Sequence, residues 1–286
     1  MSIVRHPVTW VYAVLLVIGV IGLVPLLIAA FEGSPAGFLL GVVLWTLFTV
    51  LAWWAIRRFS RTRPRPRLAT LAAFAWGAII ATGLGRWATG GVGDIAGAVI
   101  PDEGWAGAIA AGVSEEPLKL LGVFALSLFA ATRMRSALDF VYYGAFVGLG
   151  FMVVESLLYA AQGAQTGDSP MTIVVEYVIL RGILAALWSH PTFTALAAIG
   201  LAVLVRSGAS AVRRWLAFLG MLVLAMALHA LFDSPVLESN MMVAFFAKGA
   251  IVLAVFLAFY LPLRRRAARE AAPLSEETPE PASASS

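Results

Sequence analysis

The chain has 286 residues, of which 61% are hydrophobic and 13% are charged, with a formal net charge of +4. Soluble domains are nearer half apolar and a quarter charged, so this composition excludes a soluble globular protein and indicates a polytopic membrane protein. The chain contains no cysteine, which excludes disulfides and thiolate metal sites.

Eight stretches of the sequence are long and apolar enough to cross a bilayer core, which needs about 20 residues of helix. We therefore predict an all-α fold, a polytopic transmembrane helix bundle of about eight spans. Residues 1–263 would form the membrane domain, and 264–286 a basic and then disordered cytoplasmic tail rich in Pro, Ser, Ala and Glu. The predicted spans are 9–30, 36–56, 68–85, 107–131, 140–161, 182–205, 215–233 and 243–263.

The segment from 171 to 205 is too long for one simple span, at about 52 Å against a core of roughly 30 Å. The "SHP" sequence at 189–191 favours a break, because proline disfavours a helical conformation in the residue before it. We predict an external interfacial helix holding Glu176 and Arg181, followed by a kinked span. A ninth, shorter span or a re-entrant segment is the alternative.

Most of the 20 Lys and Arg residues fall in alternate connections between the predicted spans. By the positive-inside rule, this pattern places these connections and both chain termini in the cytoplasm. This topology explains why the chain has a positive net charge, so no nucleic-acid partner is predicted. The residues concerned are Arg5, the six arginines from 57 to 67, Arg133, Arg135, Arg206, Arg213, Arg214, Arg264, Arg265, Arg266 and Arg269.

Charged side chains are absent from the first three predicted spans, whereas charged residues and histidines gather in the fourth to the seventh. Each charge at the centre of a span costs about 2.5–3.5 kcal/mol on insertion scales, so these groups must neutralise one another, bind a cation or line water. The group consists of Glu115, Glu116 and Lys119 in the fourth span, Glu155 in the fifth, His190 in the sixth, and His229 and Asp233 in the seventh.

The predicted depths of these residues agree. Counted from the outer end of each span, Glu116 lies about 14 Å deep, Glu155 about 9 Å, His190 about 12 Å and His229 about 6 Å. Scattered structural charges would not be expected to share the outer half of the membrane on four separate helices. The agreement predicts one site on the extracytoplasmic side.

Helical spacing indicates which of these groups can meet. Lys119 follows the two glutamates by four and three residues and can reach either of them. His229 and Asp233 are four residues apart on one helix face, a spacing suited to two ligands of one metal. Pro117 removes an amide that would otherwise bond a carbonyl of the preceding turn.

The summed charge favours a metal. Four carboxylates and one lysine leave an excess near −3 in a low dielectric, which a divalent cation would offset. Two histidines among the available ligands favour zinc over magnesium.

Three other features have simpler interpretations. Asp139, near the start of the fifth span, is predicted to cap its helix, and Lys248 can extend its ammonium group outward from the eighth. The "GVGD" at 91–94 matches the GxGD pattern of presenilin-type aspartyl proteases. We place Asp94 in an external glycine-rich loop with no partner aspartate, and reject that reading.

Four short motifs together resemble the PrsW family of intramembrane metalloproteases: "EEPLK", "FMVVE", "HPTFT" after an upstream arginine, and "HALFD". The chain is more distantly similar to the CAAX prenyl endopeptidases of the Abi group. The resemblance covers roughly 108–234, and we take 107–234 as the predicted catalytic core.

This resemblance implies hydrolysis of a peptide bond in a membrane-anchored protein, often an anti-sigma factor, near the outer face. It implies Glu115 and Glu116 as essential glutamates, one of them activating the attacking water, with Lys119 orienting a glutamate. Glu155, His190, His229 and Asp233 would bind a divalent metal, expected to be zinc, or support its ligands. Two other classes remain open from the sequence: a proton- or ion-coupled transporter, disfavoured by the missing internal repeat, and a non-catalytic membrane scaffold.

Overall fold

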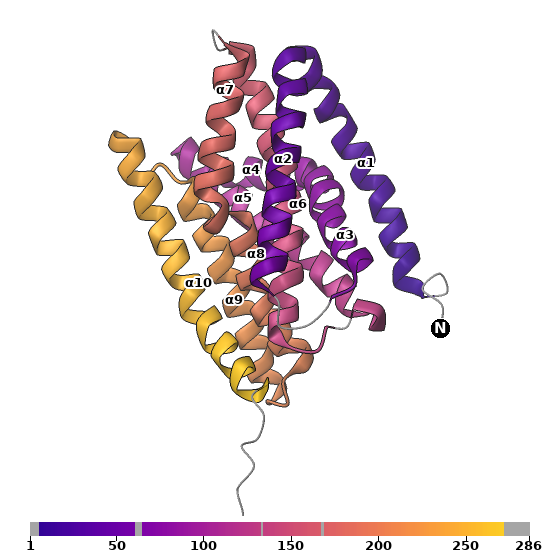
Figure 1. Ribbon diagram of the computed structural model, residues 1–286. Helices are drawn as coiled ribbons and strands as arrows, with labels where there is room; N and C mark the ends of the chain where they lie inside the picture. The colour runs from indigo at the N-terminus through magenta and orange to yellow at the C-terminus, as the bar shows by residue number, and fades with distance from the viewer. Residues whose placement is uncertain (1–5, 61–64, 133, 167–168, 272–286) are drawn as a thin grey trace, which may run out of the picture.

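The computed structural model describes residues 6–60, 65–132, 134–166 and 169–271. These residues are almost entirely helical and contain no strand, which confirms the predicted all-α class (Figure 1). The α-helices are α1 (Pro7–Gly33), α2 (Pro35–Phe59), α3 (Arg67–Ala75), α4 (Thr82–Val99), α5 (Glu103–Ser127), α6 (Ala137–Thr166), α7 (Pro170–Tyr177), α8 (His190–Arg206), α9 (Ala211–Asp233) and α10 (Met241–Ala271).

Seven helical segments within the described residues are long and apolar enough to cross a membrane. The remaining predicted span, 107–131, corresponds to α5, which has 25 residues but carries three charged side chains in its interior. The count of about eight membrane helices is therefore confirmed. The seven segments are Pro7–Gly33, Pro35–Arg58, Arg67–Val99, Ala137–Thr166, Pro170–Arg206, Ala211–Asp233 and Glu238–Glu270.

Helix α6 lies in the middle of the bundle, with α1 and α10 at opposite edges (Figure 1). It packs against α2, α3, α5, α7 and α8, and most of its residues from Leu138 to Met152 are buried. The start of α1 and the end of α10 both lie toward the lower end of the bundle in this view. The helix next to most of the others thus carries Glu155, one of the predicted site residues.

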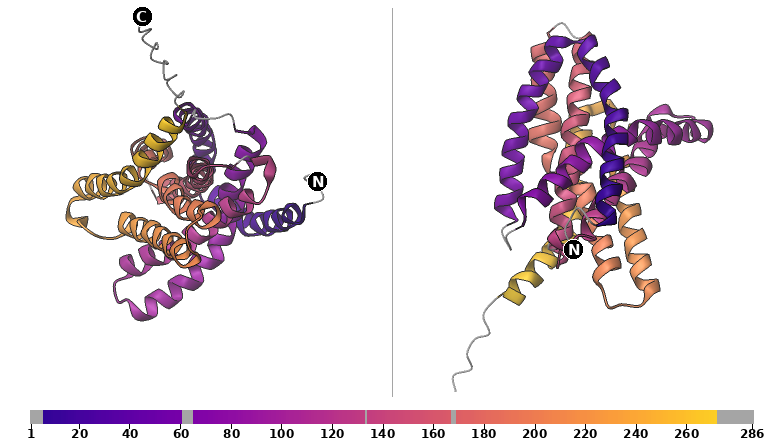
Figure 2. Two further views of the ribbon diagram at one scale, coloured as in Figure 1. Left: turned by 90° about the horizontal axis from the view of Figure 1, so that it is seen from below. Right: turned by 90° about the vertical axis from the view of Figure 1, so that its right-hand side faces the viewer.

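The helix that begins at Arg67 continues through a π-helical turn, Trp76–Ala81, into α4. The predicted glycine-rich loop is therefore wrong, because Asp94 lies inside α4. Glycine costs about 1 kcal/mol relative to alanine in a helix, which is why the composition suggested a loop. In an apolar environment the backbone must bond internally, and this requirement favours the helix. The α4–α5 hairpin extends sideways from the bundle (Figure 2).

The segment 170–206 is broken where the sequence predicted. After α7, a π-helical turn (Val178–Leu184) and a 3-10 turn (Ala185–Leu187) lead to an interruption at Trp188 and Ser189. Helix α8 then begins at His190, with Pro191 in its first turn. The break places a histidine at the first turn of a buried helix.

Asp139 has the capping role that was predicted for it. Its Oδ2 accepts hydrogen bonds from the backbone and the hydroxyl of Ser136, both at 2.9 Å, and so closes the start of α6. Its Oδ1 also pairs with Arg65 Nε at 3.0 Å, and both side chains are buried. Asp139 therefore also holds the connection that follows α2 against α6.

At its other end, α10 continues to Ala271, so the arginine-rich residues 264–269 are helical. The predicted disordered tail falls on 272–286, which lie outside the described residues.

Helices α1 and α4 cross at a point where only glycine fits. A Cβ on Gly83 would overlap the carbonyl oxygen of Gly19, and a Cβ on Gly19 would lie 2.7 Å from the carbonyl oxygen of Ile79. Small residues allow this close approach of membrane helices.

Changing Gly83 to alanine is expected to destabilise the protein by about 1–3 kcal/mol, because the backbone of α1 must shift. Thermal unfolding in detergent measures the effect. Gly90→Ala is the matched control, since no atom lies within 4 Å of a Cβ at that position of the same helix. Equal stability of the two variants would contradict the predicted clash.

Candidate active site

Helix α5 brings two adjacent glutamates and a lysine into the interior of the bundle. Glu115, Glu116 and Lys119 are all buried, with Lys119 and Glu116 having no exposed surface. The proline between them, Pro117, lies inside α5 without ending it. Helix α5 packs against α4, α6, α8 and α9, so these side chains meet residues from several other helices.

The ammonium group of Lys119 lies among acceptors from two helices. Its Nζ is 2.6 Å from Glu116 Oε1, 3.5 Å from Glu115 Oε2 and 2.9 Å from His190 Nδ1. It also lies 4.2 Å from the centre of the Phe151 ring, a cation–π contact. Removing a lone charge from water costs several kcal/mol, so these contacts are what allow a fully buried lysine here.

His229, near the end of α9, touches all three carboxylates on its side of the site. Its Nδ1 is 2.9 Å from Glu116 Oε1, and its Nε2 is 3.1 Å from Asp233 Oδ2 and 3.8 Å from Glu115 Oε2. The ring is stacked on Phe193, with the two centroids 5.0 Å apart. This packing fixes the orientation of the imidazole.

The short contacts of His229 are not well-aligned hydrogen bonds. Among the described residues, both of its ring nitrogens and Glu116 Oε1 are buried without a hydrogen-bond partner. Leaving such atoms unsatisfied costs about 1–3 kcal/mol each. Because Glu116 Oε1 is ion-paired with Lys119 at 2.6 Å, the two imidazole nitrogens are the atoms left for a further group, such as a metal ion or a water.

His190, at the start of α8, is held from the opposite side by Glu155 of α6. Its Nε2 lies 2.9 Å from Glu155 Oε2, and Arg181 Nη2 lies 2.6 Å from the same oxygen. Arg181 also donates from Nε to Ser156 Oγ at 3.2 Å and lies over the ring of Tyr159. The break before α8 and the π-helical turn carrying Arg181 together place this chain of contacts.

Glu115, His190 and His229 form the group that a metal ion could bridge. Each offers one ligand atom, and the three atoms lie within 4.8 Å of one another in a buried position. Zinc binds nitrogen and oxygen ligands at about 2.0–2.2 Å, so small side-chain movements would bring all three into contact with one ion. Two histidines and a glutamate are also a known ligand set of catalytic zinc sites.

The charge of the site fits a divalent ion. Four carboxylates, those of Glu115, Glu116, Glu155 and Asp233, meet two cationic side chains, Lys119 and Arg181. With all four carboxylates ionised, the excess is two negative charges. The sequence predicted an excess of three negative charges. The positive charge of Arg181 lowers this excess to two, which one divalent cation would neutralise. The ligand atoms and the net charge of the site therefore both fit a divalent metal ion.

The structure brings all seven predicted site residues into one connected set of contacts. Glu155 contacts His190, and Asp233 contacts His229. Glu115 lies with both histidines as a potential metal ligand. Sequence reasoning assigned no site role to Arg181 or to Thr194, whose hydroxyl donates to Glu116 Oε2 at 3.1 Å. Arg181 could have been found as the lone cation in the apolar run "VILRGIL", and Thr194 as the residue one turn after His190.

A family model described as PrsW family intramembrane metalloprotease matches residues 65–261. The chain belongs to the PrsW family. The match runs from the connection before α3 into α10, well beyond the four motifs, and contains every residue of the site. Comparisons with curated proteins and with solved structures gave no match.

Membership of the PrsW family confirms the predicted enzyme class, an intramembrane metalloprotease. Together with the seven apolar helices, it makes the protein a multi-pass membrane protein whose substrate is met within the bilayer. The transporter and the scaffold that the sequence left open are not favoured by this match.

Proposed function

We propose that this PrsW-family protein hydrolyses a peptide bond of membrane-anchored proteins, using zinc held by Glu115, His190 and His229. The observation that carries the proposal is the convergence of these three buried side chains from α5, α8 and α9. When bound, the metal would act as a Lewis acid toward the scissile carbonyl and lower the pKa of a bound water.

Glu155 and Asp233 are proposed to position the histidines. Glu155 Oε2 is 2.9 Å from His190 Nε2, and Asp233 Oδ2 is 3.1 Å from His229 Nε2. Metal-binding histidines commonly use their second nitrogen to bond a carboxylate, which fixes the ring and raises its basicity. Glu155, itself paired with Arg181, would act in this way directly on His190, and Asp233 would be a further ligand or position His229.

Glu116 is proposed as the residue that accepts the proton of the attacking water and later returns it to the leaving amine. Thr194 donates to its Oε2, and its Oε1 lies 2.9 Å from Nδ1 of His229, one of the three potential metal ligands. A water held at the metal-binding group would therefore lie within reach of this carboxylate. Lys119, 2.6 Å from Oε1 of Glu116, would hold the carboxylate in place and keep it ionised.

The reaction is proposed to take place toward the extracytoplasmic half of the membrane. Helix α8 runs from His190 to Arg206, and α9 starts beside Arg213 and Arg214 and ends just after His229. The positive-inside rule assigns these arginines to the cytoplasmic side, so both histidines lie at the opposite ends of their helices. The geometry selects no particular protein, so the proposed substrate is the class of membrane-anchored proteins, of which an anti-sigma factor is one example.

If the three side chains bind zinc, removing one of them should lower the zinc content of the purified protein. Purified wild-type protein is expected to contain about one zinc per chain, and His229→Ala to contain almost none, because one of three ligands is lost. Elemental mass spectrometry measures both. His6→Ala is the matched control, since His6 only begins α1 and packs on Phe129. Absence of metal from the wild type, or equal loss in the two variants, would contradict the ligand assignment.

Proteolysis is tested in membranes of cells that express either the wild type or Glu116→Gln. Labelling of new protein N-termini, followed by mass spectrometry, is expected to find termini made only by the wild type, within or beside the transmembrane segments of other proteins. Identical sets of termini from both strains would contradict the proposed function.

A further inference from the structure

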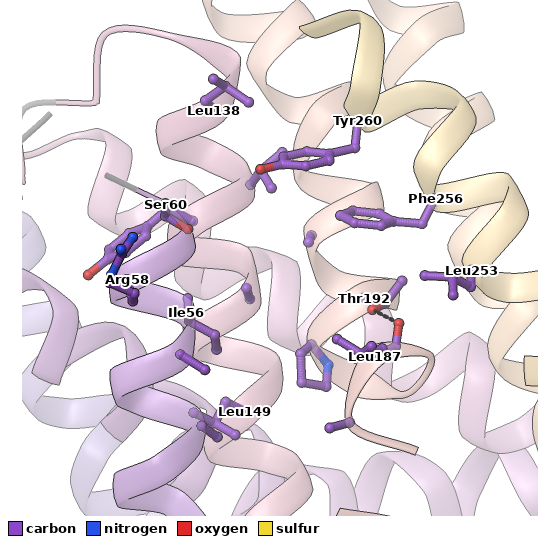
Figure 3. Close-up of a pocket in the computed structure, with 18 of the residues that line it drawn as sticks. Ile56, Arg58, Ser60, Leu138, Leu149, Leu187, Thr192, Leu253, Phe256 and Tyr260 are labelled. Carbon is purple, nitrogen blue, oxygen red and sulfur yellow. Dashed lines mark hydrogen bonds between the residues drawn. The ribbon is translucent and has the colours of Figure 1, made fainter. Parts of the chain in front are cut away.

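A cavity of about 720 Å³ lies apart from the metal-binding group, between two pairs of helices. Helices α2 and α6 form one wall, and α8 and α10 form the other (Figure 3). Its middle is lined by apolar side chains, among them Ile56, Leu149, Leu253 and Phe256. Apolar cavities of this kind do not hold water well, so the natural occupant is a hydrocarbon chain.

One end of the cavity is basic. Arg58, Arg65 and Arg264 line it together with Ser60 and the hydroxyl-bearing Tyr260, and no carboxylate is among the lining residues. Arg65 is already paired with Asp139. Arg58 and Arg264 are exposed, and no ion pair or hydrogen bond joins either side chain to another described residue. The cavity thus combines an apolar body with two available cations at its mouth.

The size of the cavity distinguishes between occupants. A membrane-spanning helix of 20 residues fills a cylinder of about 11 Å diameter and 30 Å length, or roughly 2,800 Å³. The cavity is smaller than that, so a whole substrate helix does not fit within it, whereas a single acyl chain does.

We propose that the cavity between α2, α6, α8 and α10 binds an anionic phospholipid, with its phosphate at Arg58 and Arg264 and one acyl chain in the apolar body. Both arginines belong to the clusters that the positive-inside rule assigns to the cytoplasmic side, so the lipid comes from that leaflet. Lys and Arg side chains near that surface attract anionic lipids, so two arginines at the mouth favour them over neutral lipids.

The far end of the cavity reaches the turn that carries His190. Met152 and Thr192 line it there. Met152 accepts a hydrogen bond from Ser189 at 3.1 Å, and Thr192 donates to the carbonyl of Leu187 at 2.7 Å. A bound acyl chain would therefore pack against the break before α8 and stabilise it.

The test uses the full-length protein, delipidated in a neutral detergent, with added phosphatidylglycerol or phosphatidylcholine of identical acyl chains. Native mass spectrometry measures the affinity for each lipid. The wild type is expected to bind phosphatidylglycerol about tenfold or more tightly than phosphatidylcholine, given two arginines at the mouth. The double variant Arg58→Gln/Arg264→Gln is expected to lose this preference.

Arg57→Gln/Arg265→Gln is the matched control, because these neighbouring arginines do not line the cavity. It is expected to keep the preference for phosphatidylglycerol. Equal loss in the two double variants would assign the effect to general surface charge, and an unchanged preference in Arg58→Gln/Arg264→Gln would remove the headgroup site. Either result overturns the proposal.

The apolar body has its own test. Ala145→Phe, which fills the cavity, is expected to weaken the binding of both lipids, whereas Ala258→Phe on the exposed face of α10 is expected to have no effect. A photoreactive residue in place of Leu257 is expected to crosslink to lipid. Capture of a polypeptide instead of lipid would show that the cavity serves a protein partner and would overturn the proposal.

Discussion

Replacing Glu116 with glutamine is expected to lower the rate of substrate cleavage by about 10²- to 10⁴-fold, the range by which a general base accelerates hydrolysis. The amide has nearly the same shape and can still accept the hydrogen bond of Thr194, but it cannot take a proton from water. Because Glu116 is not in the proposed ligand set, zinc content is expected to stay near the wild-type value. The cleavage rate and the metal content are measured on the same preparation.

Glu115→Gln separates the roles of the two adjacent glutamates. It removes a proposed ligand, so the loss of cleavage should be accompanied by a loss of zinc. Glu103→Gln is the matched control on the same helix, since Glu103 lies exposed in the first turn of α5 and outside the site. Near wild-type cleavage by Glu116→Gln, or equal zinc loss in Glu115→Gln and Glu116→Gln, would contradict the roles proposed for the two glutamates.

The membrane helices, and the side chains that meet in the candidate site, could be predicted because charge is so costly within a bilayer. A glutamate or histidine in an apolar run has few structural explanations, so Glu155 and His229 were recognisable from their surroundings alone. The break before His190 was equally readable, since proline acts on the residue that precedes it. Both effects depend only on residues that are close in sequence, so they can be predicted without knowing the fold.

Other features depend on contacts between distant parts of the chain. The approach of Lys119 to His190 joins residues 71 positions apart, and no spacing within one helix predicts it. The place of Arg181 depends on a π-helical turn that directs it toward Glu155 and not outward. The helix around Asp94 forms although glycine disfavours it, because the apolar surroundings outweigh local propensity.

Replacing Lys119 with methionine is expected to lower the free energy of unfolding by about 3–5 kcal/mol, because it leaves buried carboxylates without their cation. Methionine occupies a similar volume, so the effect arises from charge and not from a cavity. Thermal unfolding in detergent measures the change. Lys248→Met is the matched control, since the only other lysine binds backbone carbonyls at the end of α9 and not carboxylates. Its loss is expected to cost about 1–2 kcal/mol.

A second substitution tests whether charge is the cause. In the double variant Lys119→Met/Glu116→Gln, the carboxylate 2.6 Å from the ammonium group is neutral as well, so much of the lost stability should return. Added zinc should also stabilise Lys119→Met more than the wild type, because a divalent ion supplies the positive charge that the variant lacks. If the double variant is as unstable as the sum of the two single variants, packing and not charge is the main contribution of Lys119. A buried lysine and a metal ion would then be independent features of the site, and not two sources of the same neutralising charge.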